Sequence, residues 1–356
     1  MTSLEDLRRK IDSIDEALLK GLNERASIAR RIGELKSREN RNFHAPSREK
    51  AVLERIGKLN PGPLSNEALE AIYREIMSAS LALEEPVKVA YLGPEGTFSH
   101  LACLKNYGSS ACLIPVRSFS EVFDEVERGR VHYGVVPIEN SIEGVVNNAL
   151  DNFMRSELKI TSEILLPISH SLLSLSGEME KVRKVYSFPQ PTAQCRRWIE
   201  QHIPHLPIID MESTAGAAQR ASEDPEAAAI AGDAAARHYG LKVIEKRIED
   251  NTDNVTRFLT IAKEPAQPTG DDKTSVVFAF RNEPGALFRF LQPFAEEGIN
   301  LTKIESRPSG QKAWEYVFFV DLEGHEQDPP IRKALDRLGK DAFFLKVLGS
   351  YPRARA

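Results

Sequence analysis

The chain has 356 residues, of which 41% are hydrophobic and 28% charged, and its formal net charge at pH 7 is −5. At roughly 100–200 residues per domain, this length predicts two or three domains in an ordinary globular protein. The negative charge argues against nucleic acid as a partner, and no apolar run reaches the roughly 18 residues that a membrane span requires.

The N-terminus and the cysteines favour a cytoplasmic location. Residues 1–6, MTSLED, contain neither the basic nor the apolar segment of a secretion signal. The cysteines at positions 103, 112 and 195 are scattered, so neither a disulfide framework nor a zinc site is expected. We expect that the protein uses neither a metal ion nor another cofactor.

Residues 1–86 are predicted to form an all-helical domain. Apolar residues repeat as a heptad over positions 4–35, which predicts a first helix of about 33 residues. Thr2 and Glu5 have the spacing of a capping box at its start. Two more helices are expected at about 46–59 and 65–84. The unusual length of the first helix indicates an antiparallel or intertwined dimer.

Charged side chains interrupt the apolar faces of these helices. Arg25 occupies a core position of the heptad, and a buried guanidinium requires an anion because its uncompensated burial costs several kcal/mol or more. Other cations and polar groups fall beside the packed faces, and they could converge on one pocket: Arg8, Lys36, Arg48, Glu49, Ser80 and Glu84. The pattern is compatible either with interhelical salt bridges or with a site for a small anion.

This segment resembles the all-helical chorismate mutase family over nearly its whole length. The matching strings are LRRKI at 7–11, DEALL at 15–19, NER at 23–25, IGELK at 32–36 and PSRE at 46–49. The resemblance implies a domain-swapped dimer in which Arg8 enters the partner's site. Such an enzyme binds a dicarboxylate in a compact conformer and stabilises negative charge on the breaking ether oxygen, without proton transfer.

The resemblance also implies roles for individual side chains. Arg8, Arg25 and Arg48 would hold the two carboxylates of chorismate, and bidentate guanidinium groups suit that task. Lys36 and Glu84 would contact the ether oxygen, Glu49 the hydroxyl, and Ser80 would line the site. Two positions depart from some members of the family. Ala45 replaces a carboxylate, and Glu84 replaces a glutamine, so mutase activity is expected to fall as Glu84 ionises.

Residues 87–263 alternate short apolar strands with helices, which predicts an α/β domain. Strands are expected at 87–92, 133–136, 185–187, 208–211, 228–231 and 258–262. Four of them run into segments rich in Ser, Thr or Asn at the start of a helix. These residues act as helix caps in most proteins, but several helix N-termini at one cleft also make a carboxylate site.

This segment resembles the prephenate dehydratase family throughout. The strings are GPEGTFS at 93–99, VPIENS at 136–141, PQP at 189–191, QC at 194–195, EST at 212–214 and NVTRF at 254–258. The resemblance implies two lobes, like those of periplasmic binding proteins, with prephenate bound between them. Thr256 and Asn140 are the implied catalytic residues, and the further implied prephenate contacts are Thr97, Ser99, Ser141, Gln194, Glu212, Ser213, Thr214 and Arg257.

Residues 264–272 are predicted to be a linker, and residues 273–351 follow the strand and helix order of a ferredoxin-like α+β domain. Strands are expected at 274–280, 299–306, 314–321 and 343–348, and helices at 286–296 and 330–338. The strings GALF at 285–288 and ESRP at 305–308 resemble the ACT regulatory module. This resemblance implies a phenylalanine site between two such modules, in a homodimer. The implied contacts are Gly285, Ala286, Leu287, Glu305, Ser306 and Arg307.

Together, the three resemblances imply a bifunctional enzyme that converts chorismate to prephenate and prephenate to phenylpyruvate under inhibition by phenylalanine. Two other interpretations remain open. The chain could be a solute-binding protein fused to a sensor, without turnover, because fold alone does not decide function. Alternatively, only one active site works and the helical domain serves dimerisation, which Ala45 favours.

Overall fold

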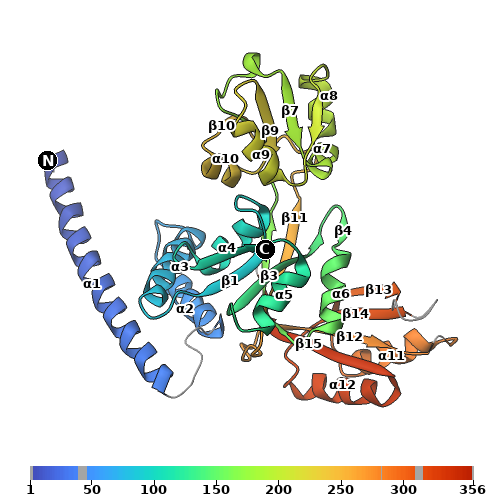
Figure 1. The fold of residues 1–356 in the computed structure, drawn as a ribbon. Coiled ribbons are helices and arrows are strands. Elements are labelled where there is room, and N and C mark those ends of the chain that lie inside the picture. The colour runs from blue at the N-terminus through green and yellow to red at the C-terminus, as the bar shows by residue number, and fades with distance from the viewer. Residues whose placement is uncertain (1–2, 39–45, 282, 309–315, 355–356) are drawn as a thin grey trace. The chain divides into compact units, whose positions relative to one another are not determined.

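The computed structural model describes residues 3–38, 46–281, 283–308 and 316–354. The chain divides into two compact units, Met1–Lys88 with Asn106–Cys112, and Val89–Lys105 with Leu113–Ala356. The first unit is helical. The second contains three sheets and the helices that cover them (Figure 1).

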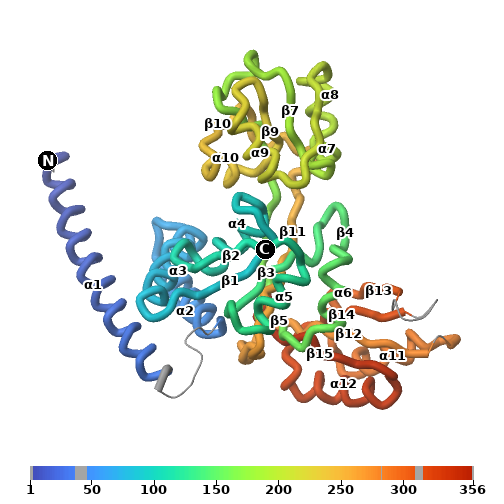
Figure 2. The backbone as a smooth tube through the Cα atoms, viewed as in Figure 1, coloured from blue at the N-terminus to red at the C-terminus, as the bar shows by residue number. Residues whose placement is uncertain are grey.

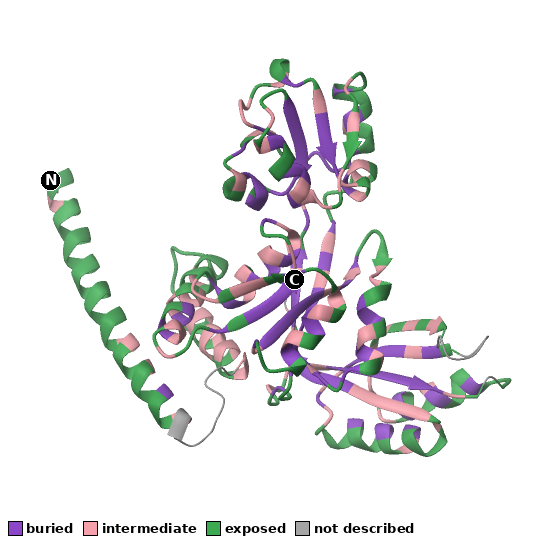
Figure 3. Cartoon of the chain, viewed as in Figure 1, coloured by how far each residue is buried: buried purple, intermediate pink, exposed green. Residues whose placement is uncertain are grey.

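The helical unit contains α1 (Leu4–Arg38), α2 (Pro46–Leu59) and α3 (Asn66–Ala82). The single long first helix confirms the prediction from the heptad. Its capping box lies one residue later than expected: Ser3 Oγ accepts from the Asp6 backbone N–H at 3.1 Å, and the Ser3 N–H donates to the Asp6 carboxylate at 3.0 Å. Thr2 lies outside the described residues. Figure 3 shows α1 exposed along nearly its whole length.

The second unit begins with a lobe built on a mixed sheet in the order β2-β1-β3-β11-β5, with the short β4 paired to β3. Strands β1 and β3 are parallel, and β11 is antiparallel to β3. The elements are β1 (Lys88–Leu92), α4 (Phe98–Tyr107), β2 (Cys112–Val116), α5 (Phe119–Glu127), β3 (Tyr133–Asn140), β4 (Gly144–Val145), α6 (Asn147–Arg155), β5 (Lys159–Pro167) and β11 (Val255–Ala262).

A second lobe contains a sheet in the order β10-β6-β9-β7-β8, in which β7 is parallel to β8 and β9. Its elements are β6 (Ser171–Ser174), a 3-10 turn (Met179–Lys181), β7 (Lys184–Ser187), α7 (Pro189–Gln194), α8 (Arg196–His202), β8 (Ile208–Asp210), α9 (Thr214–Ser222), β9 (Ala227–Ala231), α10 (Asp233–Tyr239) and β10 (Lys242–Glu245). The chain passes between the lobes twice, from β5 to β6 and from β10 to β11 (Figure 2).

The C-terminal segment has the predicted ferredoxin-like order. It contains β12 (Asp272–Ala279), α11 (Ala286–Glu296), β13 (Leu301–Pro308), β14 (Tyr316–Glu323), α12 (Pro329–Asp341) and β15 (Phe344–Pro352). The sheet order is β13-β14-β12-β15, so β13 and β15 are edge strands. The predicted third strand was expected from Trp314, which lies outside the described residues.

The C-terminal sheet shares a hydrophobic core with the first lobe. Phe153 and Ile160 of that lobe are buried in the same cluster as Val277, Phe319 and Tyr351. β15 also approaches β5 closely, because a Cβ atom at Gly349 would lie 2.3 Å from a carbonyl oxygen of β5. This continuous packing explains why the two parts form one compact unit despite the expected linker between them.

Candidate active sites

The helical unit contains a cavity of about 510 Å³ that opens between α1, α2 and α3. Its wall combines cations and acids with apolar side chains: Gly21, Glu24, Arg25, Ile28, Ala29, Ile32, Lys36, Arg48, Glu49, Val52, Arg55, Tyr73, Met77, Ser80 and Leu81. The prediction that Arg25, Lys36, Arg48, Glu49 and Ser80 converge is therefore met. Arg55 is a further cation of the wall, and its position one turn after Val52 was the sequence signal that could have indicated it.

A hydroxyl group orients the central guanidinium of this cavity. The buried Ser80 Oγ donates to the carbonyl oxygen of Ile76 at 2.7 Å, so it is left to accept from Arg25 Nη1, also at 2.7 Å. Since the hydroxyl hydrogen of Ser80 is already bonded to the carbonyl oxygen of Ile76, Ser80 can only accept from Arg25. This contact fixes one side of the Arg25 guanidinium group. The remaining N–H groups of Arg25 are then held in a defined direction for an anion.

Glu84 and Arg8 are placed differently from the rest of the predicted set. The Glu84 carboxyl lies directly over Gly33 of α1, because a Cβ atom at Gly33 would be 1.7 Å from Glu84 Oε2. Burial raises the pKa of the Glu84 carboxyl, and the charge of Lys36 opposes this shift. Arg8 is exposed near the start of α1 and is not part of the cavity wall.

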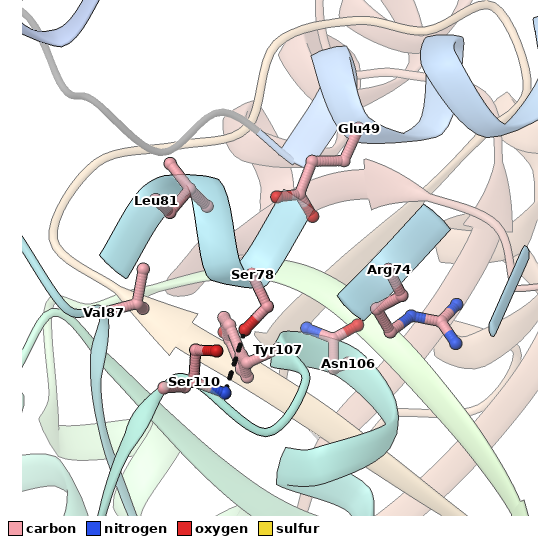
Figure 4. Close-up of a pocket in the computed structure, with 9 residues that line it drawn as sticks. Glu49, Arg74, Ser78, Leu81, Val87, Asn106, Tyr107 and Ser110 are labelled. Carbon is pink, nitrogen blue, oxygen red and sulfur yellow. Dashed lines mark hydrogen bonds between the residues drawn. The ribbon is translucent and has the colours of Figure 1, made fainter. Parts of the chain in front are cut away.

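A second cavity of the helical unit has a volume of only about 10 Å³, which is the space of one water molecule (Figure 4). Glu49 and Arg74 reach its rim. Below them, the backbone N–H of Ser110 donates to Ser78 Oγ at 3.2 Å. The cavity is too small for an organic substrate, so we assign it to packing around α3.

In the second unit, strand register brings two of the predicted residues together. Thr256, at the start of β11, is the cross-strand neighbour of Asn140, at the end of β3. Both side chains are buried, and Asn140 Nδ2 donates to Thr256 Oγ1 at 2.9 Å. Parallel β1 and β3 end at the same edge of the sheet, so the GPEGTFS loop that follows β1 lies at this edge too.

The amide orientation of Asn140 is determined by its backbone partners. Its Oδ1 accepts from the N–H groups of Ile142 at 3.0 Å and Glu143 at 3.1 Å. Nδ2 must therefore face Thr256, whose oxygen accepts one of its hydrogens. The Thr256 hydroxyl is thus left with its own hydrogen for another acceptor, which makes it a hydrogen-bond donor toward a ligand.

Gln194, from α7 in the other lobe, joins the same cluster. Its Nε2 donates to Glu143 at 2.8 Å, and its Oε1 accepts from Asn254 Nδ2 at 3.2 Å. Asn254 Oδ1 in turn accepts from Asn140 at 2.7 Å. Three of the predicted residues, Asn140, Gln194 and Thr256, therefore lie in one network that spans both lobes.

The other predicted prephenate contacts have local hydrogen bonds in this structure. Thr97 Oγ1 donates to the Pro94 carbonyl at 2.9 Å, and Ser213 caps α9 by accepting from Gly216 N–H at 2.9 Å. Ser141 Oγ accepts from the Val255 N–H at 3.0 Å and so aligns the start of β11 with β3. The buried Ser99 lies in the first turn of α4, close in sequence to Thr97. Glu212 and Thr214 flank Ser213 where the chain passes from β8 into α9.

Arg257 points away from Thr256, because successive side chains of a strand face opposite sides of the sheet. Its guanidinium is nearly buried between the first lobe and the C-terminal sheet. It donates to Glu163 at 2.8 Å, Asp321 at 2.5 Å and the Tyr351 hydroxyl at 2.9 Å. We therefore assign Arg257 to the junction of the two sheets.

The predicted effector residues lie on two segments of the C-terminal sheet domain. Gly285 has a left-handed backbone (φ 74°) at the N-cap of α11, a conformation that favours glycine. Ala286 is buried and Leu287 partly exposed. Glu305 and Ser306 lie on the edge strand β13, and Arg307 of that strand pairs with Asp151 of α6 at 2.9 Å.

Comparison with known proteins accounts for all three parts of the chain. Family models match at residues 7–85 (chorismate mutase type II), 89–266 (prephenate dehydratase) and 274–340 (ACT domain). The bifunctional chorismate mutase/prephenate dehydratase of Aquifex aeolicus is 52% identical over 99% of both chains, and that of Escherichia coli is 31% identical over 97% of this chain and 95% of its own. The chain belongs to this family.

A solved structure is similar to most of this chain. It is the prephenate dehydratase from Arthrobacter aurescens in complex with L-Phe, which is 38% identical with a TM-score of 0.70. It spans 75% of this chain and 90% of its own. Within the described ranges, no cluster of three or more His, Cys, Asp or Glu side chains is arranged to hold a metal ion, and no helix is long and apolar enough to cross a bilayer.

Three residues of the dehydratase site were not predicted from the sequence: Asn254, Glu143 and His170. Asn254 stands in the NVTRF string beside Thr256, so that string contained the signal for it. Glu143 and His170 had no signal of their own, since an isolated acid or histidine has no diagnostic spacing. Only the fold brings them to Gln194.

Proposed function

We propose that this chain catalyses both reactions, the rearrangement of chorismate to prephenate in the helical domain and the decarboxylating dehydration of prephenate to phenylpyruvate between the two lobes, and that phenylalanine inhibits it. The observation that carries the proposal is the hydrogen-bond polarity at Thr256. Asn140 donates to Thr256 Oγ1, so the hydroxyl hydrogen is available to a departing group.

The mutase reaction suits the cavity of the helical domain. Chorismate carries two carboxylates, and Arg25 and Arg48 present forked donors to such groups. Lys36 and a protonated Glu84 would stabilise the negative charge that develops on the ether oxygen, while Glu49 binds the ring hydroxyl. Positioning and charge stabilisation are sufficient, because the rearrangement transfers no proton.

The dehydratase reaction suits the network at Thr256. Prephenate loses its ring carboxylate as CO2 while the C–O bond to the ring hydroxyl breaks, and a proton is needed to release that hydroxyl as water. Thr256 would donate its hydrogen bond to the leaving oxygen. Thr97, Ser99, Ser141, Glu212, Ser213 and Thr214, at the strand ends of the two lobes, are proposed to bind the remaining polar groups of the substrate.

We expect Thr256→Val to abolish dehydratase activity, with a loss of about 100-fold or more in kcat/KM, because it removes the donor at the leaving group. The measurement is phenylpyruvate formation from prephenate. Thr260→Val is a matched control on the same strand, since the buried Thr260 hydroxyl has no hydrogen-bond partner among the described residues. Both variants should retain mutase activity, and loss of both activities in Thr256→Val would contradict the assignment.

Phenylalanine is the proposed effector because the chain contains an ACT domain and because a prephenate dehydratase similar over 75% of the chain was solved in complex with L-Phe. The left-handed backbone at Gly285 and the polar residues Glu305 and Ser306 are the proposed contacts, with Ala286, Leu287 and Arg307 as further members of the predicted set. Dehydratase rates with and without phenylalanine test this directly. An unchanged rate together with an unchanged unfolding temperature would reject the effector role.

A homodimer is proposed because α1 leaves its apolar heptad residues exposed. Ile11, Ile14 and Leu18 are each more than half exposed in the single chain. A second copy of α1 would cover them and bring Arg8 to the partner's mutase site. The ACT edge strand β13 offers a second contact, since edge strands have free backbone groups. Three free cysteines support the proposed cytoplasmic location.

Mixing two inactive variants tests the swapped arrangement. Arg8→Ala and Arg25→Ala should each lack mutase activity, because each removes one guanidinium from every site. If Arg8 enters the partner's site, heterodimers contain one intact site, so co-refolded mixtures should regain about a quarter of wild-type activity by random pairing. No recovery in mixtures that form dimers would reject the swap.

A further inference from the structure

His170 lies on the first crossing between the lobes, between β5 and β6, and it ends the amide network that starts at Thr256. Its side chain is 2% exposed, and its Nε2 lies 2.9 Å from Gln194 Oε1. The ring packs edge-on against Phe98 of α4, with centroids 5.6 Å apart. The backbone N–H of His170 donates to Glu249 at 2.8 Å, which fixes the chain at this point.

The orientation of Gln194 decides which atom of its amide faces the histidine. Glu143 is a carboxylate and can only accept, so the Gln194 atom that contacts it is the amide nitrogen. The oxygen of Gln194 therefore faces both Asn254 Nδ2 and His170 Nε2. Because an amide oxygen only accepts hydrogen bonds, His170 must carry its hydrogen on Nε2.

The other ring nitrogen agrees with this tautomer. Nδ1 of His170 is buried and has no hydrogen-bond partner among the described residues. A hydrogen placed on Nδ1 would be a buried donor without an acceptor, and the lone pair on Nε2 would then face the Gln194 oxygen. Burial also lowers the pKa of His170 against the opposing effects of Gln194, Glu249 and Glu143, so the neutral ring is favoured.

Every amide of the network then has a defined donor and a defined acceptor. His170 and Asn254 donate to the Gln194 oxygen, Asn140 donates to the Asn254 oxygen, and Asn140 donates to Thr256. If the amide of Gln194 rotated by 180°, its NH2 group would face the NH2 group of Asn254, and their hydrogen bond would be lost. Asn254 could then turn over, and its amide nitrogen would oppose Asn140.

We propose that His170, as the neutral Nε2–H tautomer, is a positioning residue of the dehydratase: together with Glu143 it holds the Gln194 oxygen toward Asn254, and it thereby supports the Asn140 amide that leaves the Thr256 hydrogen free to point at the substrate. This inference rests on the proposed dehydratase function. It requires no contact between His170 and the substrate. Its effect should therefore appear in the chemical step and not in substrate binding.

Two substitutions separate hydrogen bonding from packing. His170→Leu removes the donor and should lower dehydratase kcat about 10-fold or more, the loss expected for one hydrogen bond in an ordered network, while KM changes less than about 2-fold. His170→Gln supplies an amide N–H near the position of Nε2 and should restore kcat to within about 3-fold of wild type. His205→Leu, at an exposed loop histidine, is the control for loss of an imidazole.

The tautomer provides a readout that is independent of rate. In 15N spectra of the full-length wild-type protein, assigned by comparison with His170→Gln, His170 should have a protonated Nε2 and an unprotonated Nδ1 at neutral pH. A protonated Nδ1 would overturn the proposal, even if His170→Leu failed to fold. So would wild-type kcat in a folded His170→Leu variant. A wild-type protein without any turnover of prephenate would instead reject the proposed function.

Discussion

We expect the pH dependence of the mutase reaction to be set by the carboxyl group of Glu84. It lies over Gly33 of α1, where burial raises its pKa and the nearby charge of Lys36 limits the shift. Only the protonated carboxyl can donate a hydrogen bond to an ether oxygen. A raised pKa extends this protonated form toward neutral pH, and the form is lost as pH increases through that pKa.

We therefore expect mutase kcat/KM to fall as pH rises through the pKa of Glu84. Glu84→Gln should remove this descending limb, because the amide donates at every pH. The measurement is a pair of pH–rate profiles with chorismate as substrate. Superimposable profiles for the two proteins would show that Glu84 does not act as a donor in the reaction.

At the scale of secondary-structure elements, the contact of β15 with β5 depends on Gly349. A Cβ atom there would lie 2.3 Å from a backbone oxygen and 2.7 Å from a backbone nitrogen of Ile160, and backbone atoms cannot move aside as a side chain can. Gly349→Ala should therefore lower the free energy of unfolding by about 1–3 kcal/mol, a cost typical of overpacking.

Gly339→Ala is a suitable control for this substitution. Gly339 lies within α12, and its added Cβ would meet only the flexible Leu345 side chain at 3.5 Å, an ordinary contact. This variant should gain about 0.5–1 kcal/mol, because alanine is a better helix former than glycine. Denaturant unfolding measures both. Equal stability of Gly349→Ala and wild type would contradict the close approach of the strands.

The helices and the C-terminal strands were predictable because their apolar residues repeat with a clear period. The helix α11 was predicted with its observed bounds, and the ferredoxin-like order is confirmed. The strands β2, β4, β5, β6 and β10 were missed. β5 illustrates the reason, because it buries the polar residues Thr161 and Glu163, which hide the apolar pattern of a strand. The negative charge of Glu163 is balanced by Arg257 and Lys273, which are distant in the sequence.

The residues of the candidate sites were also predictable only in part, and for a related reason. Asn140, Gln194 and Thr256 stand in characteristic strings, whereas His170 and Glu143 acquire their roles only through the packing of two lobes. For Arg257 the string placed the residue near the site, but strand geometry turns its side chain toward the ACT sheet. Sequence strings identify the neighbourhood of a side chain and not the direction in which it points.

At the scale of the whole molecule, the junction between the dehydratase and the ACT sheet offers a path for regulation. Thr256 and Arg257 are adjacent on β11, and Arg257 donates hydrogen bonds to Asp321 and Tyr351 of the ACT sheet. The hydroxyl groups of Tyr351 and Ser275 are also hydrogen-bonded, at 2.6 Å. A shift of that sheet would therefore act on the strand that contains Thr256, whose hydroxyl is the proposed hydrogen-bond donor to the leaving group. Coupling of this kind requires that phenylalanine binds two states differently.

Asp321→Asn should weaken the effect of phenylalanine on dehydratase activity, because it removes one of the two carboxylates that bind Arg257. We expect the half-inhibitory concentration to rise about 5-fold or more, with mutase activity unchanged. Inhibition curves for the folded variant measure this. Glu296→Gln, which weakens an exposed ion pair with Arg337, should leave inhibition unchanged. Equal curves for Asp321→Asn and wild type would exclude this path.

The long first helix has a further consequence for the dissociation and unfolding of the protein. Ile11, Ile14 and Leu18 are exposed in the single chain. If a second copy covers them, as proposed, association and folding of the mutase domain become one coupled process. Its melting temperature should then increase with protein concentration, whereas a transition of the sheet-containing unit that occurs within one chain should not. At high dilution the protein would therefore lose mutase activity while it still converts prephenate to phenylpyruvate.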